Sequence, residues 1–155
     1  NPQKPGSEEY LDSEKYQLRS WDLDREDSIA DVISSINKIR NENPALQNNR
    51  SLRFHPVDNE QLICYSKYDE KNQNIIVVIA NLDPYHKHSG WVELPLKRFG
   101  MSELETYQVY DLFTNSWFIW NGARSYVELD PRVSPAHIFK VRKKVRTERD
   151  FDYFL

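Results

Sequence analysis

Cysteine is almost absent from this sequence: Cys64 stands alone among 155 residues, which excludes an internal disulfide bond. Long apolar runs are missing as well, since none approaches the roughly 18 to 20 residues of a membrane-spanning helix, and no basic-then-apolar signal segment opens the chain. No charge of one sign dominates, because 21 basic and 24 acidic side chains leave a net charge of −3. These absences predict a cytoplasmic protein with neither a membrane nor a nucleic acid as partner.

Glycine is also scarce, and four glycines leave no glycine-rich phosphate loop. Neither a nucleophile elbow nor a Cys/His pair is present. His86 and His88 follow Asp83 closely, but no third histidine or cysteine at metal-ligand spacing joins them, so we interpret them as part of a solvated loop. We therefore predict no catalytic residue, no metal and no cofactor in this chain.

The most informative segment is residues 74–82, which contains six consecutive apolar residues, 75–80. A strand of this kind has no wet face, so it is expected to be buried on both sides. Shorter segments with alternating or aromatic-rich patterns surround it; they are residues 52–54, 62–68, 91–94, 106–113, 117–120, 125–129 and 136–143. About eight strands at this short spacing predict an antiparallel sandwich or barrel.

One helix is predicted upstream of the strands. It is expected to start after Asp24 or Asp27 and to end near residues 41–43, because Pro44 forces the preceding residue out of helical geometry. Apolar residues at spacings of three and four form a single stripe along it: Ile29, Val32, Ile33, Ile36 and Ile39. This stripe needs a partner surface, either the β domain itself or the parallel sheet of a barrel.

Two further patterns lie near the C-terminal end. Trp117 and Trp120 are three apart on a strand and point to opposite faces, so at most one is expected to be exposed. The basic run Lys140–Arg146 is interpreted as an edge strand protected by charge. Residues 146–155 end in four apolar positions out of five, which fits a frayed terminus or a tail that docks on a neighbour.

The residues before the helix lack any periodicity. Glu8–Asp22 combines carboxylates with Lys, Arg, Tyr and Trp, which fits either a plain surface loop or a site for a hydroxyl-rich ligand, where charged groups bind hydroxyls and rings stack on sugars. Composition alone does not choose between them.

Residues 8–16, Glu-Glu-Tyr-Leu-Asp-Ser-Glu-Lys-Tyr, resemble almost residue for residue the α-amylase-superfamily maltosyltransferases (glycoside hydrolase family 13) that use α-maltose 1-phosphate to lengthen α-1,4-glucans. Residues 81–84, 110–112 and 135–139 resemble the C-terminal β-sandwich of that family more loosely. The resemblance therefore covers the chain to about Lys144, but only the C-terminal end of the family.

This resemblance implies that residues 1–50 are the loop arm and last helix of a catalytic (β/α)8 barrel, that residues 51–145 are a β-sandwich, and that residues 146–155 are a tail. Lys15 and Tyr16 match family residues that contact the maltosyl sugar. No residue matches the family's nucleophile or acid, so we expect this chain alone to be inactive, with α-glucan and maltose 1-phosphate bound by the parent enzyme and the β-sandwich stabilising the barrel.

Two alternatives remain open at this point. The chain could be a carbohydrate-binding module, in which an exposed indole of Trp91, Trp117 or Trp120 stacks on glucan. It could also be the C-terminal domain of another α-amylase-family hydrolase, because a β-sandwich is a generic fold. The oligomeric state does not follow from the sequence.

Overall fold

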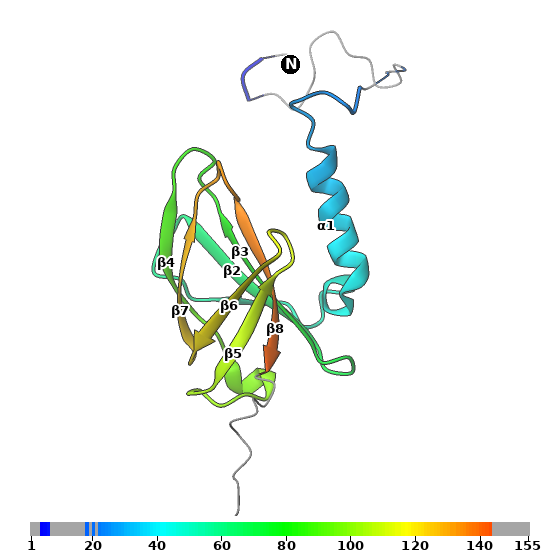
Figure 1. The fold of residues 1–155 in the computed structure, drawn as a ribbon. Helices are drawn as coiled ribbons and strands as arrows, with labels where there is room; N and C mark the ends of the chain where they lie inside the picture. The colour runs from blue at the N-terminus through cyan, green and yellow to red at the C-terminus, as the bar shows by residue number, and fades with distance from the viewer. Residues whose placement is uncertain (1–3, 7–17, 19, 21, 144–155) are drawn as a thin grey trace, which may run out of the picture. The chain divides into compact units, whose positions relative to one another are not determined.

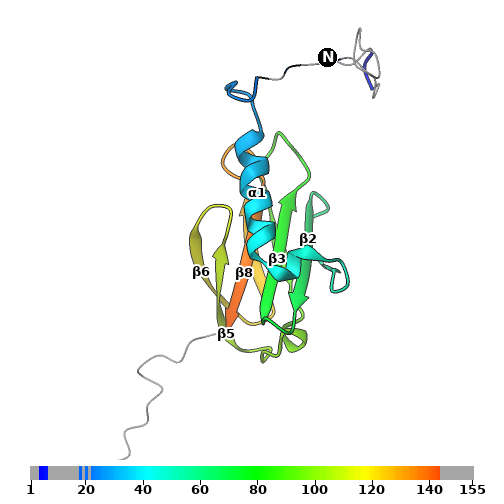
Figure 2. The same ribbon diagram turned by 90° about the vertical axis from the view of Figure 1, so that its right-hand side faces the viewer.

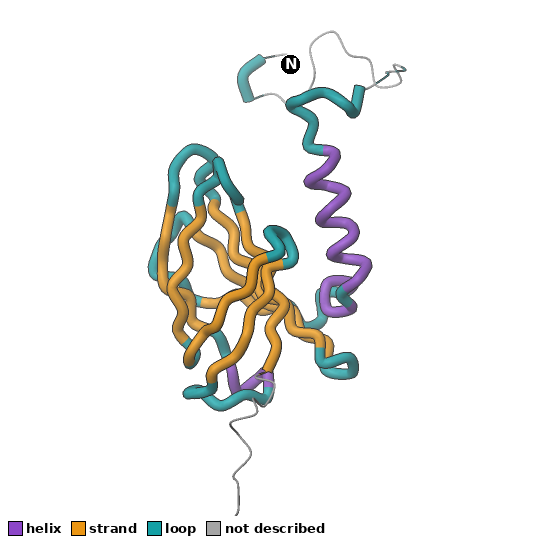
Figure 3. The backbone as a smooth tube through the Cα atoms, in the orientation of Figure 1, coloured by secondary structure: helices purple, strands orange, loops and turns teal. Residues whose placement is uncertain are grey.

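A computed structural model describes residues 4–6, 18, 20 and 22–143. The chain divides into two compact units, Asn1–Val32 and Ile33–Leu155. Strands dominate the second unit, as Figure 3 shows in orange.

The strands form two antiparallel sheets within the second unit (Figure 1). The larger sheet has the order β1-β2-β3-β8-β5-β6; its strands are β1 (Arg53–His55), β2 (Leu62–Asp69), β3 (Asn74–Asn81), β8 (Ala136–Lys143), β5 (Thr106–Asp111) and β6 (Ser116–Asn121). The smaller sheet pairs β4 (His88–Glu93) with β7 (Arg124–Leu129). This arrangement is the predicted antiparallel β-sandwich.

Strand β3 is the buried strand that the apolar run predicts, and Ile75–Ile79 is buried on both faces. Because side chains alternate along a strand, the two faces contribute to two separate cores. The inner core lies between the two sheets and contains Val77 of β3, Val109 of β5, Val127 of β7 and Phe139 of β8. The other face of the larger sheet, here called the outer face, carries Ile76 and Val78.

A helix closes over part of the outer face. Helix α1 (Ala30–Glu42) ends just before the short 3₁₀ helix η1 (Pro44–Gln47). Ile39 of α1 and Ala45 of η1 are buried in a second cluster with residues of β3 and β8; the strand residues are Ile76, Val78 and Ile138. These side chains are buried outside the sandwich, so the larger sheet packs against other elements on both of its faces.

Two buried asparagines fix the junction between α1 and η1. The Asn43 side chain donates to the Ile39 carbonyl at 2.8 Å and accepts from the Asn74 side-chain amide at 3.1 Å. Asn74 Oδ1 in turn accepts from the Ala45 backbone N–H at 3.1 Å. Buried polar groups require hydrogen-bond partners. The hydrogen bonds of these two asparagines link the end of the helix to the start of β3.

Several sequence predictions are confirmed. Trp120 is buried whereas Trp117 is exposed, so only one of these two indoles meets solvent. The apolar stripe and the helix end at Glu42 also agree with the sequence.

Two predictions are wrong. The basic strand at Lys140 is not an edge strand, because β8 lies between β3 and β5 and pairs with both (Figure 2). Lys140 and Arg142 lie on the outer face, where Lys140 pairs with Ile76 and Tyr110, while Phe139 and Val141 face the inner core. The helix also begins later than Asp24 or Asp27 suggests, at Ala30.

Candidate functional site

The two residues predicted to contact sugar, Lys15 and Tyr16, lie outside the described residues. Their role stays a prediction, and so do the domain boundaries after residues 50 and 145. The tail 146–155 lies outside the described residues too. The described part of the chain nevertheless presents one apolar face and two carboxylate–histidine groups that bear on function.

The apolar stripe of α1 is largely exposed. Ile33 is 49% exposed and Ile36 is 43% exposed, whereas Ile39, one turn further on, is 7% exposed. Ile29 and Val32 are also exposed. An amphipathic helix normally buries such a stripe against a partner, so only the last turn of α1 has found its partner within the described residues.

A groove of about 430 Å³ adjoins the stripe, and we call it the α1 groove. Its lining combines residues of α1, η1, the loop after η1, β2, β3 and β8; these are Ile36, Ile39, Arg40, Leu46, Gln47, Asn48, Asn49, Tyr65, Lys67, Val78, Ala136 and Ile138. Partial burial lowers the pKa of Lys67, and repulsion from Arg40 lowers it further. Two cations therefore lie beside an apolar floor, and neither forms an ion pair within the described residues.

The outer face carries more apolar surface on either side of this groove. Directly paired residues lie on the same face of a sheet, and the register places Phe54 of β1 and Trp117 and Ile119 of β6 on the outer face. All three are exposed. A sheet face in contact with water is usually polar, so these three exposed side chains are candidates for contact with a covering partner.

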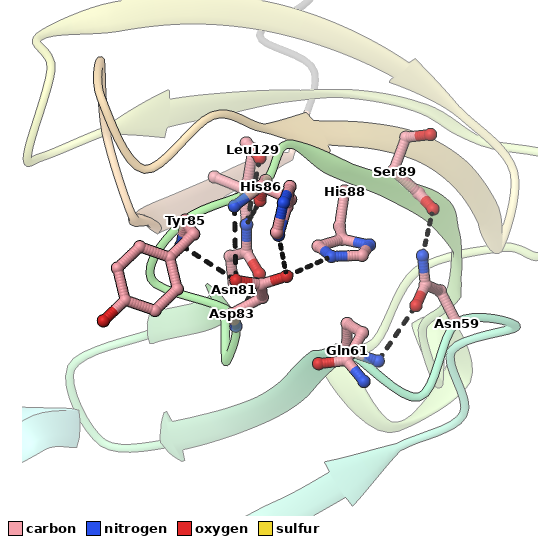
Figure 4. A network of polar contacts seen from close by, with 9 residues as sticks. All are labelled: Asn59, Gln61, Asn81, Asp83, Tyr85, His86, His88, Ser89 and Leu129. Carbon is pink, nitrogen blue, oxygen red and sulfur yellow. Dashed lines mark hydrogen bonds and ion pairs between the residues drawn. The ribbon is translucent and has the colours of Figure 1, made fainter.

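A second feature is the loop after β3, where Asp83 holds two histidines (Figure 4). His86 Nδ1 lies 2.8 Å and His88 Nε2 lies 3.1 Å from the same oxygen, Asp83 Oδ2. Asp83 Oδ1 accepts the backbone N–H of Tyr85 at 2.8 Å. The Tyr85 N–H, followed by the two histidines, holds the pKa of Asp83 below its usual range. The Asp83 carboxylate thus organises this loop through hydrogen bonds. The sequence alone indicated only that the loop is solvated.

Asn81 joins this loop to the smaller sheet. Its side-chain amide donates to the carbonyls of His86 at 2.8 Å and Leu129 at 3.2 Å (Figure 4). Within residues 22–143 and the few described before them, no group of three or more His, Cys, Asp or Glu side chains is arranged to hold a metal ion. We therefore assign the Asp83 network a role in shaping the loop.

The third feature is a buried carboxylate, Asp111, at the end of β5, with no exposed surface. One oxygen accepts the backbone N–H groups of Phe113 and Ile138, both at 3.0 Å. The other accepts from Thr114 Oγ1 at 2.6 Å and pairs with His137 Nδ1 at 2.7 Å. Burial raises the pKa of Asp111, but these hydrogen bonds outweigh it and hold the pKa below its usual range.

Sequence reasoning missed this pair. Asp111 and His137 each fall in a segment that carries the family resemblance, but they are 26 residues apart, and only the pairing of β5 with β8 brings them together. The available signal was the position of each residue at one end of a predicted strand.

The exposed indoles do not form an open platform. Trp91 packs edge-on against Tyr126 with ring centroids 5.5 Å apart, and the Arg124 guanidinium lies 5.1 Å from the Trp91 ring centre. The ring centroids of Trp117 and Tyr110 are 4.3 Å apart, and the Arg142 guanidinium lies 5.2 Å from the Trp117 ring centre. These neighbours reduce the ring surface on which a sugar could stack.

No helix in the described part of the chain has the length and apolarity needed to cross a bilayer.

Residues 54–141 match the family model described as "GLGE, C-terminal". An α-1,4-glucan:maltose-1-phosphate maltosyltransferase from Chlorobaculum tepidum is 43% identical over 143 residues, which cover 88% of this chain and 21% of that protein. The enzyme of the same name from Corynebacterium pseudotuberculosis is 45% identical over 139 residues, covering 87% and 21%. The chain thus spans about a fifth of the length of these relatives.

Solved structures agree on the fold. A maltogenic α-amylase from Thermotoga neapolitana aligns with a TM-score of 0.57 at 15% identity, covering 76% of this chain and 26% of that one. An Anoxybacillus α-amylase aligns with a TM-score of 0.52 at 13% identity, covering 76% and 23%. At this identity the likeness supports the amylase-type β-sandwich and no specific activity.

Proposed function

Because this chain belongs to the family described as "GLGE, C-terminal", we propose that it is the C-terminal part of a maltosyltransferase and packs against the catalytic barrel of that enzyme. In the proposed enzyme, maltosyl units pass from α-maltose 1-phosphate to an α-1,4-glucan, as the relatives' names state for those proteins. The chain's own contribution is structural: it covers and stabilises the barrel.

The observation that carries this proposal is the exposed apolar surface on α1 and beside it. Ile33 and Ile36 continue the line of Ile39, which is buried, but they meet no partner among the described residues. The α1 groove and the exposed Phe54 and Trp117 extend the same kind of surface over the outer face. Covering it would remove apolar area from water, and a side chain that is already half buried would contribute about half of the roughly 1.5 to 3 kcal/mol that full burial of an exposed one contributes.

Catalysis belongs to the rest of the proposed enzyme. A retaining glycosyl transfer needs two carboxylates about 5 Å apart on either side of the reacting sugar. We assign that pair to the barrel and expect no transfer by this chain alone. Lys15 and Tyr16 are proposed to complete the donor site by contacting the maltosyl group when the barrel is present.

Complementation tests the proposal. The Chlorobaculum tepidum relative, with its matching C-terminal fifth deleted, is co-expressed with this 155-residue chain, and phosphate release from maltose 1-phosphate is measured with maltohexaose as acceptor. We expect no release from either piece alone and release from the two together. With a chain carrying Ile33→Glu and Ile36→Glu, we expect the restored rate of phosphate release to be at least about tenfold lower, since two charges would be buried at the interface.

A matched control is Glu93→Gln, which changes a charge on β4 in the smaller sheet, away from the α1 surface, and should restore release as well as the unchanged chain. Release by this chain alone would overturn the structural role. Equal complementation by the unchanged and the doubly substituted chains would overturn the assigned packing surface.

A further inference from the structure

The Asp111–His137 pair borders a pocket that none of the interactions above explains. It measures about 410 Å³ and lies where loops of the two sheets meet. Its lining comes from the β3–β4 loop, the β5–β6 turn, β6, the end of β7, the β7–β8 loop and the start of β8; the residues are Lys87, Thr114, Ser116, Phe118, Glu128, Leu129, Asp130, Val133, Ser134 and His137. We call it the His137 pocket. Its volume is in the range of small-ligand sites.

One imidazole nitrogen in this pocket, Nε2 of His137, is available to accept a hydrogen bond from a ligand. The ionised Asp111 can only accept, so His137 Nδ1 carries the hydrogen of their 2.7 Å contact. In the neutral ring this leaves Nε2 as an acceptor. Nε2 has no hydrogen-bond partner among the described residues. Every fully buried polar side-chain atom in the described part of the chain does have a partner, so Nε2 is not fully buried. Nε2 is therefore open to solvent within the pocket.

The rest of the lining determines what Nε2 could bind. Lys87 and Glu128 face each other at 3.2 Å, and Asp130 pairs with Arg132 at 2.9 Å, so the charges cancel in pairs. An anion would meet two carboxylates and a cation would meet an ammonium group. A neutral ligand with many hydroxyls would find both donors and acceptors, as well as the partly exposed ring of Phe118.

From this chemistry we infer that the His137 pocket binds a glucosyl unit of an α-1,4-glucan, with His137 Nε2 accepting a sugar hydroxyl and Phe118 contacting the ring. The choice of glucan over other saccharides rests on the proposed function. The residues of this site include neither Lys15 and Tyr16 nor the indoles of Trp91 and Trp117. It would hold the acceptor polymer near the enzyme while chain ends react elsewhere.

The test uses the 155-residue chain and calorimetric titration with maltohexaose, and cellohexaose serves as the β-linked control. The decisive variant is His137→Asn, because its amide can still donate to Asp111 while Nε2 is lost. Phe118→Ala removes the ring contact. Trp117→Ala is the matched control, since Trp117 is the adjacent residue on β6 and lies on the opposite face.

We expect saturable binding of maltohexaose, a loss of about tenfold or more in affinity with His137→Asn and Phe118→Ala, and less than about twofold with Trp117→Ala. In the unchanged chain, the ¹⁵N resonance of His137 Nε2 should shift during the titration, which tests the site without any variant. Absence of saturable binding, an unmoved Nε2 resonance, or equal losses in all three variants would overturn the inference. Equal binding of cellohexaose would overturn the assignment to an α-linked glucan.

The two proposals fail in different ways. If complementation succeeds and maltohexaose does not bind this chain, the pocket assignment is wrong and the structural role stands. If maltohexaose binds at His137 and complementation fails, the chain's role in a maltosyltransferase is wrong.

Discussion

Asp111 shows how much a single side chain can contribute at the end of a strand. It joins β5 to β8 through the Ile138 N–H, fixes the turn through Phe113 and Thr114, and orients His137. A buried carboxylate is tolerated only when its oxygens are fully hydrogen-bonded, and here both oxygens accept two bonds. The same side chain thus has a structural and a positioning role.

This arrangement predicts a pH dependence of stability. The folded-state pKa of Asp111 is lowered, so the stabilisation is present above the unfolded pKa near 3.8 and is lost as pH falls through the folded pKa. Asp111→Asn should lower the free energy of unfolding by about 1.5 to 3 kcal/mol at pH 7, because hydrogen bonds to a charged group are lost. The difference from the unchanged chain should shrink between pH 4 and pH 2 in urea titrations.

Asp27→Asn serves as the control for that experiment, because Asp27 pairs with Arg25 at the surface and its loss should cost less at pH 7. A gap between the unchanged and Asp111→Asn proteins that stays constant from pH 7 to pH 2 would show that ionisation of Asp111 does not contribute.

At the scale of elements, local patterns predicted most of the strands but not their neighbours. The uninterrupted run at Ile75–Ala80 identified β3 because burial on both faces leaves a direct mark on the sequence. Strand order leaves no such mark, and Lys140 and Arg142 made β8 look like an edge although it is central. The error arises because charges on one exposed face and charges on an exposed edge produce the same alternation.

The candidate site could be predicted only in part. The stripe on α1 was visible from its spacing, and its need for a partner followed from β-branched side chains on one side only. The α1 groove and the His137 pocket were not visible, since each gathers residues from segments that only the pairing of distant strands brings together.

Helix α1 predicts two opposite outcomes for one kind of substitution. Ile33→Gln should change the free energy of unfolding of this chain by no more than about 0.5 kcal/mol, because Ile33 is half exposed and Gln suits a helix. Ile39→Gln should cost about 2 kcal/mol or more, because Ile39 is buried against Ile76 and Ile138. Urea denaturation followed by tryptophan fluorescence measures both. Similar losses for the two variants would mean that the whole stripe is already packed.

At the scale of the molecule, stability resides in the sandwich and its cover. Every buried hydrophobic side chain among the described residues lies at Ile39 or later. Both hydrophobic clusters accordingly belong to the second unit, Ile33–Leu155. The family match at residues 54–141 falls within the same unit.

Deleting residues 1–29 should therefore leave the melting temperature within about 3 °C of the full chain, because none of the core side chains that the structure describes is removed. Differential scanning calorimetry of the two proteins measures this. Deleting β8 together with the residues after it should abolish the cooperative transition. A large drop in melting temperature on the first deletion would place essential packing before α1.

The position of β8 also bears on how the protein is made. Strands β3 and β5 do not pair with each other, and each depends on β8 to fill the space between them. A growing polypeptide on the ribosome can thus form two half-sheets, β1-β2-β3 and β5-β6, but cannot join them until residues 136–143 emerge. Nascent chains that stall before this point would expose both half-sheets, which makes the speed of translation up to and through residues 136–143 a determinant of yield.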